Sequence, residues 1–413
     1  TQTRSRRESL SVRDIGKIPR IKNPIRRNRC KFDLKRFLKT YHANSFRLDF
    51  SPDHDKYIER LQRIVLNGGL SAIAMPRGGG KTTIAEFTAQ WAIFYGHRKY
   101  VPILGATDVK ATNILDDIKT SCETNEMLQD DFPEVLYPIK RIERIAHRCK
   151  GQMCCGVPTR IEWTSDRLVF PTIKGSKASG SVLLVFGITG AFRGEKTLLP
   201  DGSVIRPDFC IIDDPQTAET AKSVEQCKDR IAIIRGDVLG LAGPDQKIAA
   251  VMPCTVIRKD DLADQMLNRQ KHPEWQGHRT KMVNRFPDKD SEGAKLWDQY
   301  AEVRRDSLRR EDEGREATAF YEANRIAMDD GFEVSWNQRF VKGELSAQQH
   351  AMNLRLDNGD AAFFSEYNND PLEVDNDIFK LTIDQICSKV NMRPRGTIPL
   401  SCQKLVSFID VQQ

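Results

Sequence analysis

The sequence contains no apolar stretch that approaches the roughly 20 residues a membrane-spanning helix needs. It also has no segment with the basic, apolar and small-residue order of a secretory signal. Charged residues make up 29% of the 413 residues. We therefore expect a soluble protein whose default compartment is the cytosol. Because the chain begins with Thr1 rather than Met, we also expect that its N-terminus has been trimmed.

Ten cysteines lie at irregular spacing, which does not fit the framework of a small disulfide-stabilised protein. Cys210 and Cys254 lie within apolar runs, where we expect them to pack as small hydrophobic side chains. A further group of possible metal ligands consists of His147, Cys149, Cys154 and Cys155. Their spacing fits no common zinc-binding pattern, so we favour reduced thiols over a metal site.

Acidic residues are scarce at the beginning of the chain. Residues 1–39 contain 14 Lys or Arg but only Glu8, Asp14 and Asp33, a net charge of +11, whereas the whole chain carries +7. Because so polar a segment cannot order itself, we predict a basic, flexible arm over residues 1–31. Such an arm could bind nucleic acid or an acidic partner, or remain solvated without a partner.

Strand and helix patterns alternate through the middle of the chain. Helical patterns cover residues 56–66, the stretch that ends at Tyr95 and the stretch that begins at Asp108. This alternation predicts an α/β fold with a largely parallel sheet. From about residue 285 to 349 the chain is charged and helix-prone, which predicts a helical subdomain or lid. The predicted strands cover residues 70–75, 101–104, 168–170, 182–186, 209–212 and 248–252.

A glycine-rich turn lies between the first predicted strand and a helical pattern. In such a turn the backbone N–H groups point at phosphate oxygens, and the helix dipole adds positive potential. Lys81 would reach the β- and γ-phosphates of a nucleotide, and Thr82 would ligate magnesium. The predicted nucleotide-binding residues of the turn are Pro76, Arg77, Gly78, Gly79, Gly80, Lys81, Thr82 and Thr83.

Two features of this turn leave alternatives open. Met75 stands where the standard phosphate-binding pattern has Gly, so the match is a variant, and a turn that closes an ordinary strand–helix unit is the alternative. Arg77 is unusual inside such a loop. Its guanidinium could contact the γ-phosphate, which we favour, or it could face solvent.

Two adjacent carboxylates follow the apolar run of residues 209–212. Adjacent acids after a buried strand are costly unless they meet a cation, which favours a magnesium site over a simple polar end of the strand. An ATPase needs one carboxylate for the metal shell and a second one to orient the attacking water. We assign Asp213 to the metal and Asp214 to the water.

The order of these motifs resembles that of the large terminase subunit of tailed bacteriophages, the ATP-driven motor that packages DNA into a procapsid. AMPRGGGKTT is similar to the family's variant phosphate loop with an internal Arg. FGITGAFRG and RPDFCIIDDPQT resemble the segments around its acidic strand. VMPCTVIRKDDLADQML resembles the family's coupling segment. FFSEYNNDPL resembles the segment that joins the motor to the nuclease domain, and LVSFIDV resembles the first strand of that domain. The resemblance spans residues 50–413.

The resemblance implies roles for four further residues. Thr255 would couple hydrolysis to movement. Arg193 would be donated to the γ-phosphate of a neighbouring subunit, with an ordinary surface arginine as the alternative. His54 would contact adenine, with a cap at a helix start as the alternative. Asp410 would ligate two divalent ions, Mg²⁺ or Mn²⁺, in a nuclease site; because only three residues follow it, we expect that this chain does not cut DNA.

The resemblance also implies the domain organisation. It predicts a P-loop NTPase of the RecA/ASCE type, followed by a helical lid and by the start of an RNase H-like nuclease domain. The basic arm precedes these parts. The boundaries are residues 1–31 for the arm, 32–284 for the ATPase core, 285–370 for the helical lid, 371–400 for a linker and 401–413 for the first nuclease strand.

The function implied is an ATP-driven translocase of double-stranded DNA that requires Mg²⁺. Its partners would be further copies of the chain in a ring, the portal protein and a small terminase subunit. It would act in the host cytoplasm, transiently at the procapsid portal. Two alternatives remain: a helicase-like DNA-dependent ATPase, which should contain a second motor lobe, and a nucleotide-binding assembly or regulatory protein without turnover.

Overall fold

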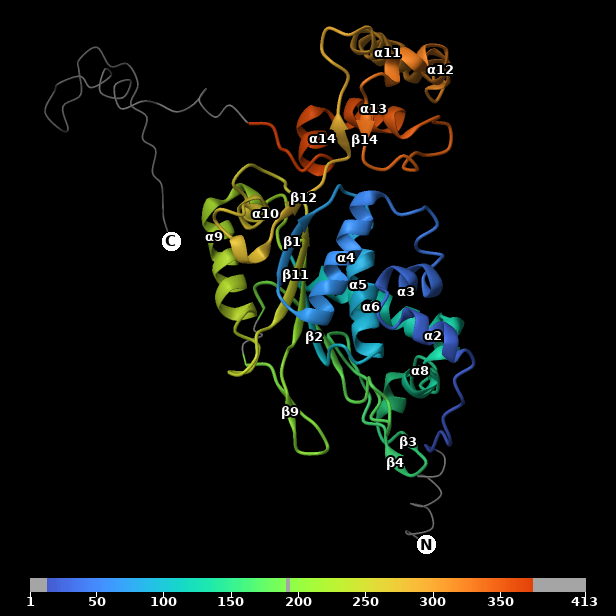
Figure 1. The fold of residues 1–413 in the computed structure, drawn as a ribbon, viewed down its shortest axis with the longest axis vertical. Helices are drawn as coiled ribbons and strands as arrows, with labels where there is room; N and C mark the ends of the chain where they lie inside the picture. The colour runs from blue at the N-terminus through green and yellow to red at the C-terminus, as the bar shows by residue number, and fades with distance from the viewer. Residues whose placement is uncertain (1–12, 191–193, 374–413) are drawn as a thin grey trace, which may run out of the picture. The chain divides into compact units, whose positions relative to one another are not determined.

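The computed structural model describes residues 13–190 and 194–373 of the chain. Its centre is an eight-stranded sheet, which Figure 1 shows with helices on both of its faces. Neighbouring strands from β12 to β7 pair in parallel, whereas β6 pairs antiparallel with both of its neighbours, β7 and β5. Their order is β12 (His278–Arg279), β1 (Leu70–Ala74), β11 (Ala249–Cys254), β10 (Phe209–Asp213), β2 (Tyr100–Gly105), β7 (Val182–Gly187), β6 (Arg167–Val169) and β5 (Glu162–Trp163).

The apolar runs form strands because both faces of the sheet are covered, so consecutive side chains are all buried. Ile73 and Ile211 pack into the hydrophobic cluster on one face, whereas Cys210 and Cys254 pack into the cluster on the other. Both cysteines are fully buried, as expected of small hydrophobic side chains. The predicted α/β fold with a mostly parallel sheet is confirmed.

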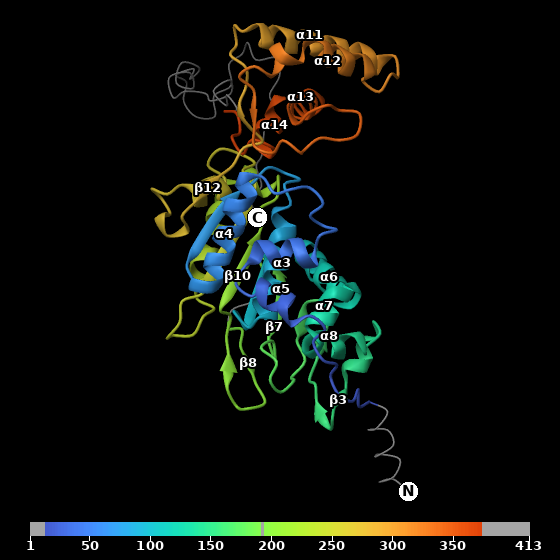
Figure 2. The ribbon, with the colours of Figure 1, turned by 45° about the vertical axis from the view of Figure 1, so that its right-hand side comes forward.

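The helices divide between the two faces of the sheet. Figure 1 shows α3 to α6 on one face and α9 with α10 on the other, and Figure 2 shows α3 to α6 from a second direction. The α6 helix, for example, starts where the Thr107 side chain accepts a hydrogen bond from the Lys110 N–H. The helices around the sheet are α2 (Pro24–Cys30), α3 (Leu34–Tyr41), α4 (Pro52–Asn67), α5 (Lys81–Phe94), α6 (Asp108–Thr124), α7 (Glu126–Asp131), α8 (Pro133–Lys140), α9 (Val224–Ile233) and α10 (Leu262–Leu267).

Residues 283–366 form a group of helices with its own hydrophobic cluster, within the same compact unit of residues 1–372. Trp297, Tyr300 and Tyr321 are at the centre of this cluster and are nearly or fully buried. We call this group the helical region; most of it was predicted to be helical. Its elements are β13 (Val283–Arg285), α11 (Glu292–Arg309), α12 (Arg315–Asp329), β14 (Glu333–Val334), α13 (Ala347–Asn358) and α14 (Asp360–Glu366).

Short hairpins and turns complete the described residues. The segment before β10 contains the antiparallel pair of β8 (Thr197–Leu198) and β9 (Val204–Ile205). The other elements are η1 (Ala146–Cys149), η2 (Thr220–Lys222), η3 (Ile234–Val238), η4 (Pro273–Trp275), β3 (Met153–Cys154) and β4 (Val157–Pro158).

The prediction of a flexible arm over residues 1–31 is wrong for its last part. Residues 24–30 form α2, and the Arg26 guanidinium contacts the fully buried carboxylate of Asp131 at 2.6 Å. The Tyr41 hydroxyl also donates a hydrogen bond to Asp131, at 2.7 Å. The basic segment is ordered here because its charges meet buried acids elsewhere in the fold, which composition does not reveal. Residues 1–12 of the predicted arm lie outside the described residues.

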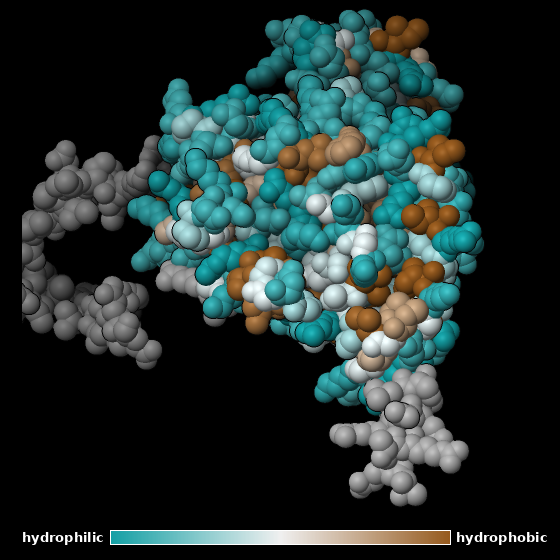
Figure 3. All heavy atoms as spheres, turned by 60° about the horizontal axis from the view of Figure 1, so that its bottom comes forward, coloured by the Kyte–Doolittle hydropathy of each residue, from teal (hydrophilic) through white to brown (hydrophobic). Residues whose placement is uncertain are grey.

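The surface drawn in Figure 3 is mainly hydrophilic, with separate apolar patches rather than one continuous apolar face. Among the described residues, no helix combines the length and the apolar character that crossing a bilayer requires. The predicted linker, apart from residues 371–373, and the predicted nuclease strand of residues 401–413 lie outside the described residues.

Candidate nucleotide-binding site

The glycine-rich loop, residues 76–80, joins the end of β1 to the N-terminus of α5. Gly78 and Gly80 both have a φ of 74°, a left-handed conformation that residues with a side chain rarely adopt. A Cβ atom on Gly79 would lie 2.9 Å from the carbonyl oxygen of Pro76. The loop therefore needs its glycines to bring backbone N–H groups to the start of a helix, where anions bind.

The ammonium group of Lys81 is held by two residues from neighbouring strands. Lys81 Nζ donates to Thr255 Oγ1 at 2.7 Å and lies 2.9 Å from Asp214 Oδ2. Thr255 directly follows β11, and Asp214 directly follows β10. Because parallel strands end at the same edge of the sheet, three residues far apart in the sequence meet beside the glycine-rich loop.

Thr82 and Asp213 also meet at this edge. The Thr82 hydroxyl lies 2.9 Å and 3.0 Å from the two carboxylate oxygens of Asp213. Burial, followed by the neighbouring charge of Asp214, raises the pKa of Asp213 above its usual range. A buried carboxylate of this kind gains from a cation, because the cation removes the cost of burying a charge.

The oxygen atoms of Thr82 and Asp213 suit Mg²⁺, which is held by one or two carboxylates together with substrate phosphates and water. Within residues 13–190 and 194–373, no three or more His, Cys, Asp or Glu side chains form a group that could hold a metal by themselves. The pair therefore fits a metal that is shared with a phosphate rather than one enclosed by the protein.

Asp214 has an unusual backbone conformation, with a φ of 38°. Its N–H donates to the carbonyl oxygen of Pro253 at 2.9 Å, which fixes the turn after β10. Residues with side chains are strained at positive φ, and such strain is concentrated at functional sites. The turn directs the Asp214 carboxylate to Lys81 rather than to Thr82.

His54 connects the start of α4 to the glycine-rich loop. Its Nδ1 lies 2.7 Å from Ser51 Oγ, and its Nε2 lies 2.7 Å from the carbonyl oxygen of Gly79. Burial lowers the pKa of His54, which favours the neutral ring. The helix-capping interpretation of His54 is therefore confirmed, and the same ring also supports the loop.

A cavity of about 220 Å³ lies between the glycine-rich loop and the segment before α4. Aromatic side chains of Phe46, Phe50 and Trp336 line it, together with His54 and Gly78–Gly80. The rings of His54 and Trp336 lie 4.6 Å apart in an edge-to-face arrangement. A flat apolar ring fits such walls, so His54 borders a space that can accept a base while its own nitrogens are engaged elsewhere.

Arg77 contacts the helical region. Its Nη1 lies 2.7 Å from Glu366 Oε2, and its N–H donates to the carbonyl oxygen of Glu366 at 2.8 Å. The Arg77 side chain is 68% exposed. Sequence reasoning did not find Glu366, because an acid at the end of a helix 289 residues away has no local signal.

Arg339 is a second residue that the sequence did not reveal. It donates a hydrogen bond to the carbonyl oxygen of Arg77, and its Nη2 would lie 3.1 Å from a Cβ atom on Gly78. Burial lowers the pKa of Arg339, whose guanidinium lies 5.6 Å from the centre of the Tyr367 ring. The helical region therefore supplies a cation at the glycine-rich loop.

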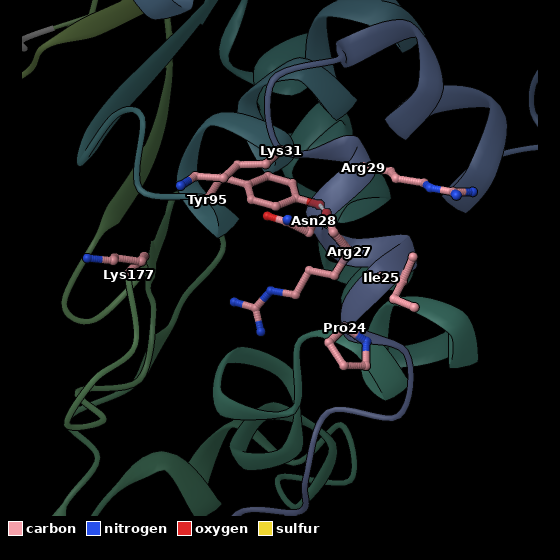
Figure 4. A pocket seen from close by; sticks show the side chains of 8 residues that line it. All are labelled: Pro24, Ile25, Arg27, Asn28, Arg29, Lys31, Tyr95 and Lys177. Carbon is pink, nitrogen blue, oxygen red and sulfur yellow. Dashed lines mark hydrogen bonds between the residues drawn. The ribbon is translucent and has the colours of Figure 1, made fainter.

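A separate basic cavity of about 690 Å³ lies beside α2. Figure 4 shows that Arg27 and Lys31 extend from α2 towards the loop that carries Lys177, whereas Arg29 points away from them. Arg27 is paired with Glu134 at 2.5 Å. The described residues that line the cavity include four cations and no carboxylate. They are Pro24, Ile25, Arg27, Asn28, Arg29, Lys31, Tyr95 and Lys177.

Two predicted site residues, Arg193 and Asp410, lie outside the described residues. His147, Cys149, Cys154 and Cys155 do not form a group that could hold a metal in the described structure. Cys149, Cys154 and Cys155 are free thiols.

Comparison with models of known protein families and with curated protein sequences finds no match to this chain. The glycine-rich loop and the side chains around it are therefore the features from which a function can be inferred. Those side chains come from three neighbouring strand ends, from the start of α4 and from the helical region.

Proposed function

We propose that this chain is an ATPase that moves double-stranded DNA, similar to the motor of large terminase subunits. One observation carries the proposal: Lys81, which follows the glycine-rich loop, contacts both Asp214 and Thr255 at the ends of neighbouring strands. A lysine held in this way is ready to exchange its partners for phosphate oxygens. The order of the strands supports a P-loop NTPase of the RecA/ASCE type, because β11 separates the loop strand β1 from the acidic strand β10.

In the proposed reaction, the loop N–H groups and Lys81 bind the β- and γ-phosphates of ATP. Thr82 and Asp213 hold Mg²⁺, which when bound neutralises phosphate charge. As Lys81 turns to the phosphates, the Asp214 carboxylate loses its ion pair and becomes free to accept a proton from the attacking water. The same contact that holds the resting site together would thereby control when the water is activated.

Thr255 would transmit this change away from the nucleotide. The N–H of the next residue, Val256, donates to Asn369 Oδ1 at 3.0 Å. Asn369 is fully buried, and its Nδ2 donates to the carbonyl oxygen of Thr280 at 2.9 Å. A shift of Thr255 when Lys81 leaves it would therefore reach the two segments that flank the helical region, at Thr280 and Asn369.

The DNA part of the proposal is supported by the basic cavity beside α2. A motor that moves along any sequence has to hold DNA through its phosphates, and phosphate binding depends on Lys and Arg. Copies of the chain in a ring, a portal protein and a small terminase subunit would be its partners, at the procapsid portal of the host cell. As part of the same proposal, Asp410 would be one of the metal ligands of a nuclease site that is only begun within these 413 residues.

The test is phosphate release from ATP and Mg²⁺, with and without double-stranded DNA, by the chain and by its Lys81→Ala variant. We expect turnover that DNA stimulates and that the variant lacks. Turnover without any response to DNA would contradict the motor. Nucleotide binding without turnover would favour instead an assembly or regulatory protein, and unwinding of a duplex would favour a helicase-like enzyme.

A further inference from the structure

Glu86 is a buried carboxylic acid for which the proposed mechanism has no use. It lies on α5, one helical turn after Thr82 and Thr83, and therefore on the same side of the helix. Its side chain is 5% exposed. No hydrogen bond or ion pair joins it to another of the described residues, and its carboxyl oxygens are not sealed from the groove that it lines. The carboxyl group is therefore available to a ligand.

Glu86 lines a polar groove of about 850 Å³ between α3, α5 and α6. Asn44, Ser45 and Thr83 also line this groove, and the same three residues line the aromatic cavity beside the glycine-rich loop. The two spaces therefore meet at a common wall. If a nucleotide placed its phosphates on the loop and its base in the aromatic cavity, its sugar would lie beside this common wall.

The chemistry of the groove favours hydroxyl groups over a metal ion. Asp117 is the other acid near Glu86 on the groove wall, yet the described residues contain no group of three or more ligands that could hold a metal. Burial, then the charges of Asp117 and Asp213, raise the pKa of Glu86 to about 8. A carboxyl group that is largely protonated at neutral pH can both donate and accept hydrogen bonds, as a pair of sugar hydroxyls requires.

We propose that Glu86 binds the ribose hydroxyls of the nucleotide and makes the site selective for ribonucleotides over deoxyribonucleotides. This inference rests on the proposed function, because it needs a nucleotide on the glycine-rich loop. Loss of a hydroxyl would leave the buried acid without its partner, and an unpaired buried group weakens binding by about tenfold.

The test is calorimetric titration of ADP, 2′-deoxy-ADP and 3′-deoxy-ADP into the full chain and two variants. We expect the wild type to bind ADP about tenfold more tightly than at least one deoxy analogue. Glu86→Ala should bind all three with nearly equal affinity, whereas Glu86→Gln, which keeps the shape and a hydrogen-bonding end, should retain part of the preference. Glu126→Gln, an exposed acid on the rim of the same groove, is the matched control and should leave the preference unchanged.

The ratio of affinities separates recognition from a merely structural role, since a structural defect weakens all three ligands alike. Equal binding of ADP and both deoxy analogues by the wild type would overturn the inference alone. A preference for ADP over the deoxy analogues that survives in Glu86→Ala would also overturn the inference. If none of the three nucleotides binds to the wild type, the proposed function fails, and the inference fails with it.

Discussion

Arg77 Nη1 lies 2.7 Å from Glu366 Oε2, so the arginine of the glycine-rich loop is ion-paired with the last turn of α14. This pair competes with the contact between Arg77 and the γ-phosphate that the sequence suggests, because one guanidinium cannot serve both without moving. Arg339 approaches the same loop from the helical region. The helical region is therefore in position to respond to the nucleotide state.

Releasing Arg77 from Glu366 should strengthen nucleotide binding. Because the Arg77 side chain is 68% exposed, the ion pair itself adds little to stability. We expect Glu366→Gln to bind an ATP analogue about two- to tenfold more tightly, with ADP less affected, since only ATP carries the γ-phosphate. The measurement is calorimetry, with Asp370→Asn, an acid paired to Lys281, as a control on the same segment. An equal gain for both nucleotides would contradict a γ-phosphate contact by Arg77.

Lys81→Ala should abolish ATP turnover. The variant removes the cation that stabilises charge on the transferred phosphoryl group, and it also leaves Asp214 and Thr255 without their shared partner. Steady-state phosphate release measures the effect. Thermal unfolding of the same variant has to show a folded protein for the loss to be assigned to catalysis, and residual turnover near the wild-type rate would exclude Lys81 from the reaction.

Asp214→Asn should separate binding from hydrolysis. An amide keeps the shape of the side chain but cannot take a proton from water, so we expect turnover to fall by about two orders of magnitude while ATP stays bound. Loss of the ion pair with Lys81 should leave that lysine freer for phosphate, so affinity should not fall. If turnover is unchanged, another acid orients the water.

Glu86→Gln should stabilise the nucleotide-free chain in a pH-dependent way. The ordinary pKa of 4.5 is raised to about 8 in the folded state, mainly by burial. The folded state thus holds the proton more tightly, and stability falls as pH rises from about 4.5 to about 8. The variant should therefore gain about 2 to 5 kcal/mol at pH 8.5 and almost nothing at pH 5. Chemical denaturation at both pH values measures this, and an equal gain at both would show that Glu86 is ionised throughout.

Reversing charge at the basic cavity should weaken DNA binding. Among the described residues that line this cavity there is no carboxylate to compete with DNA phosphates for Lys31 and Lys177. We expect the double variant Lys31→Glu/Lys177→Glu to bind duplex DNA more weakly and to reduce the salt dependence of log Kd by about two units. Fluorescence anisotropy over a range of salt concentrations measures both, with Lys289→Glu/Lys342→Glu, two exposed lysines of the helical region, as the control. Equal effects of the two double variants would show that only net charge matters.

Much of the sheet was predictable from the sequence because its strands are buried on both faces. The predicted strand of residues 70–75 corresponds to β1, and the run of residues 209–212 corresponds to β10. Apolar runs bounded by turn residues report burial directly. The α2 helix gave no such signal, because it is mostly polar and is held by ion pairs with Asp131 and Glu134, more than 100 residues away.

The turn after β1 and the acids after β10 can be recognised from the amino-acid sequence alone. Left-handed glycines at Gly78 and Gly80 and a lysine at the start of α5 are local features, and local geometry dictates the residue types. Which charges meet depends on how the chain folds. Lys81 joins Asp214 and Thr255, Arg77 joins Glu366, and Glu86 has no hydrogen-bond partner among the described residues. Such pairings depend on the order of the strands and on chain segments up to 289 residues apart, and electrostatic interactions act through space without leaving a pattern along the chain.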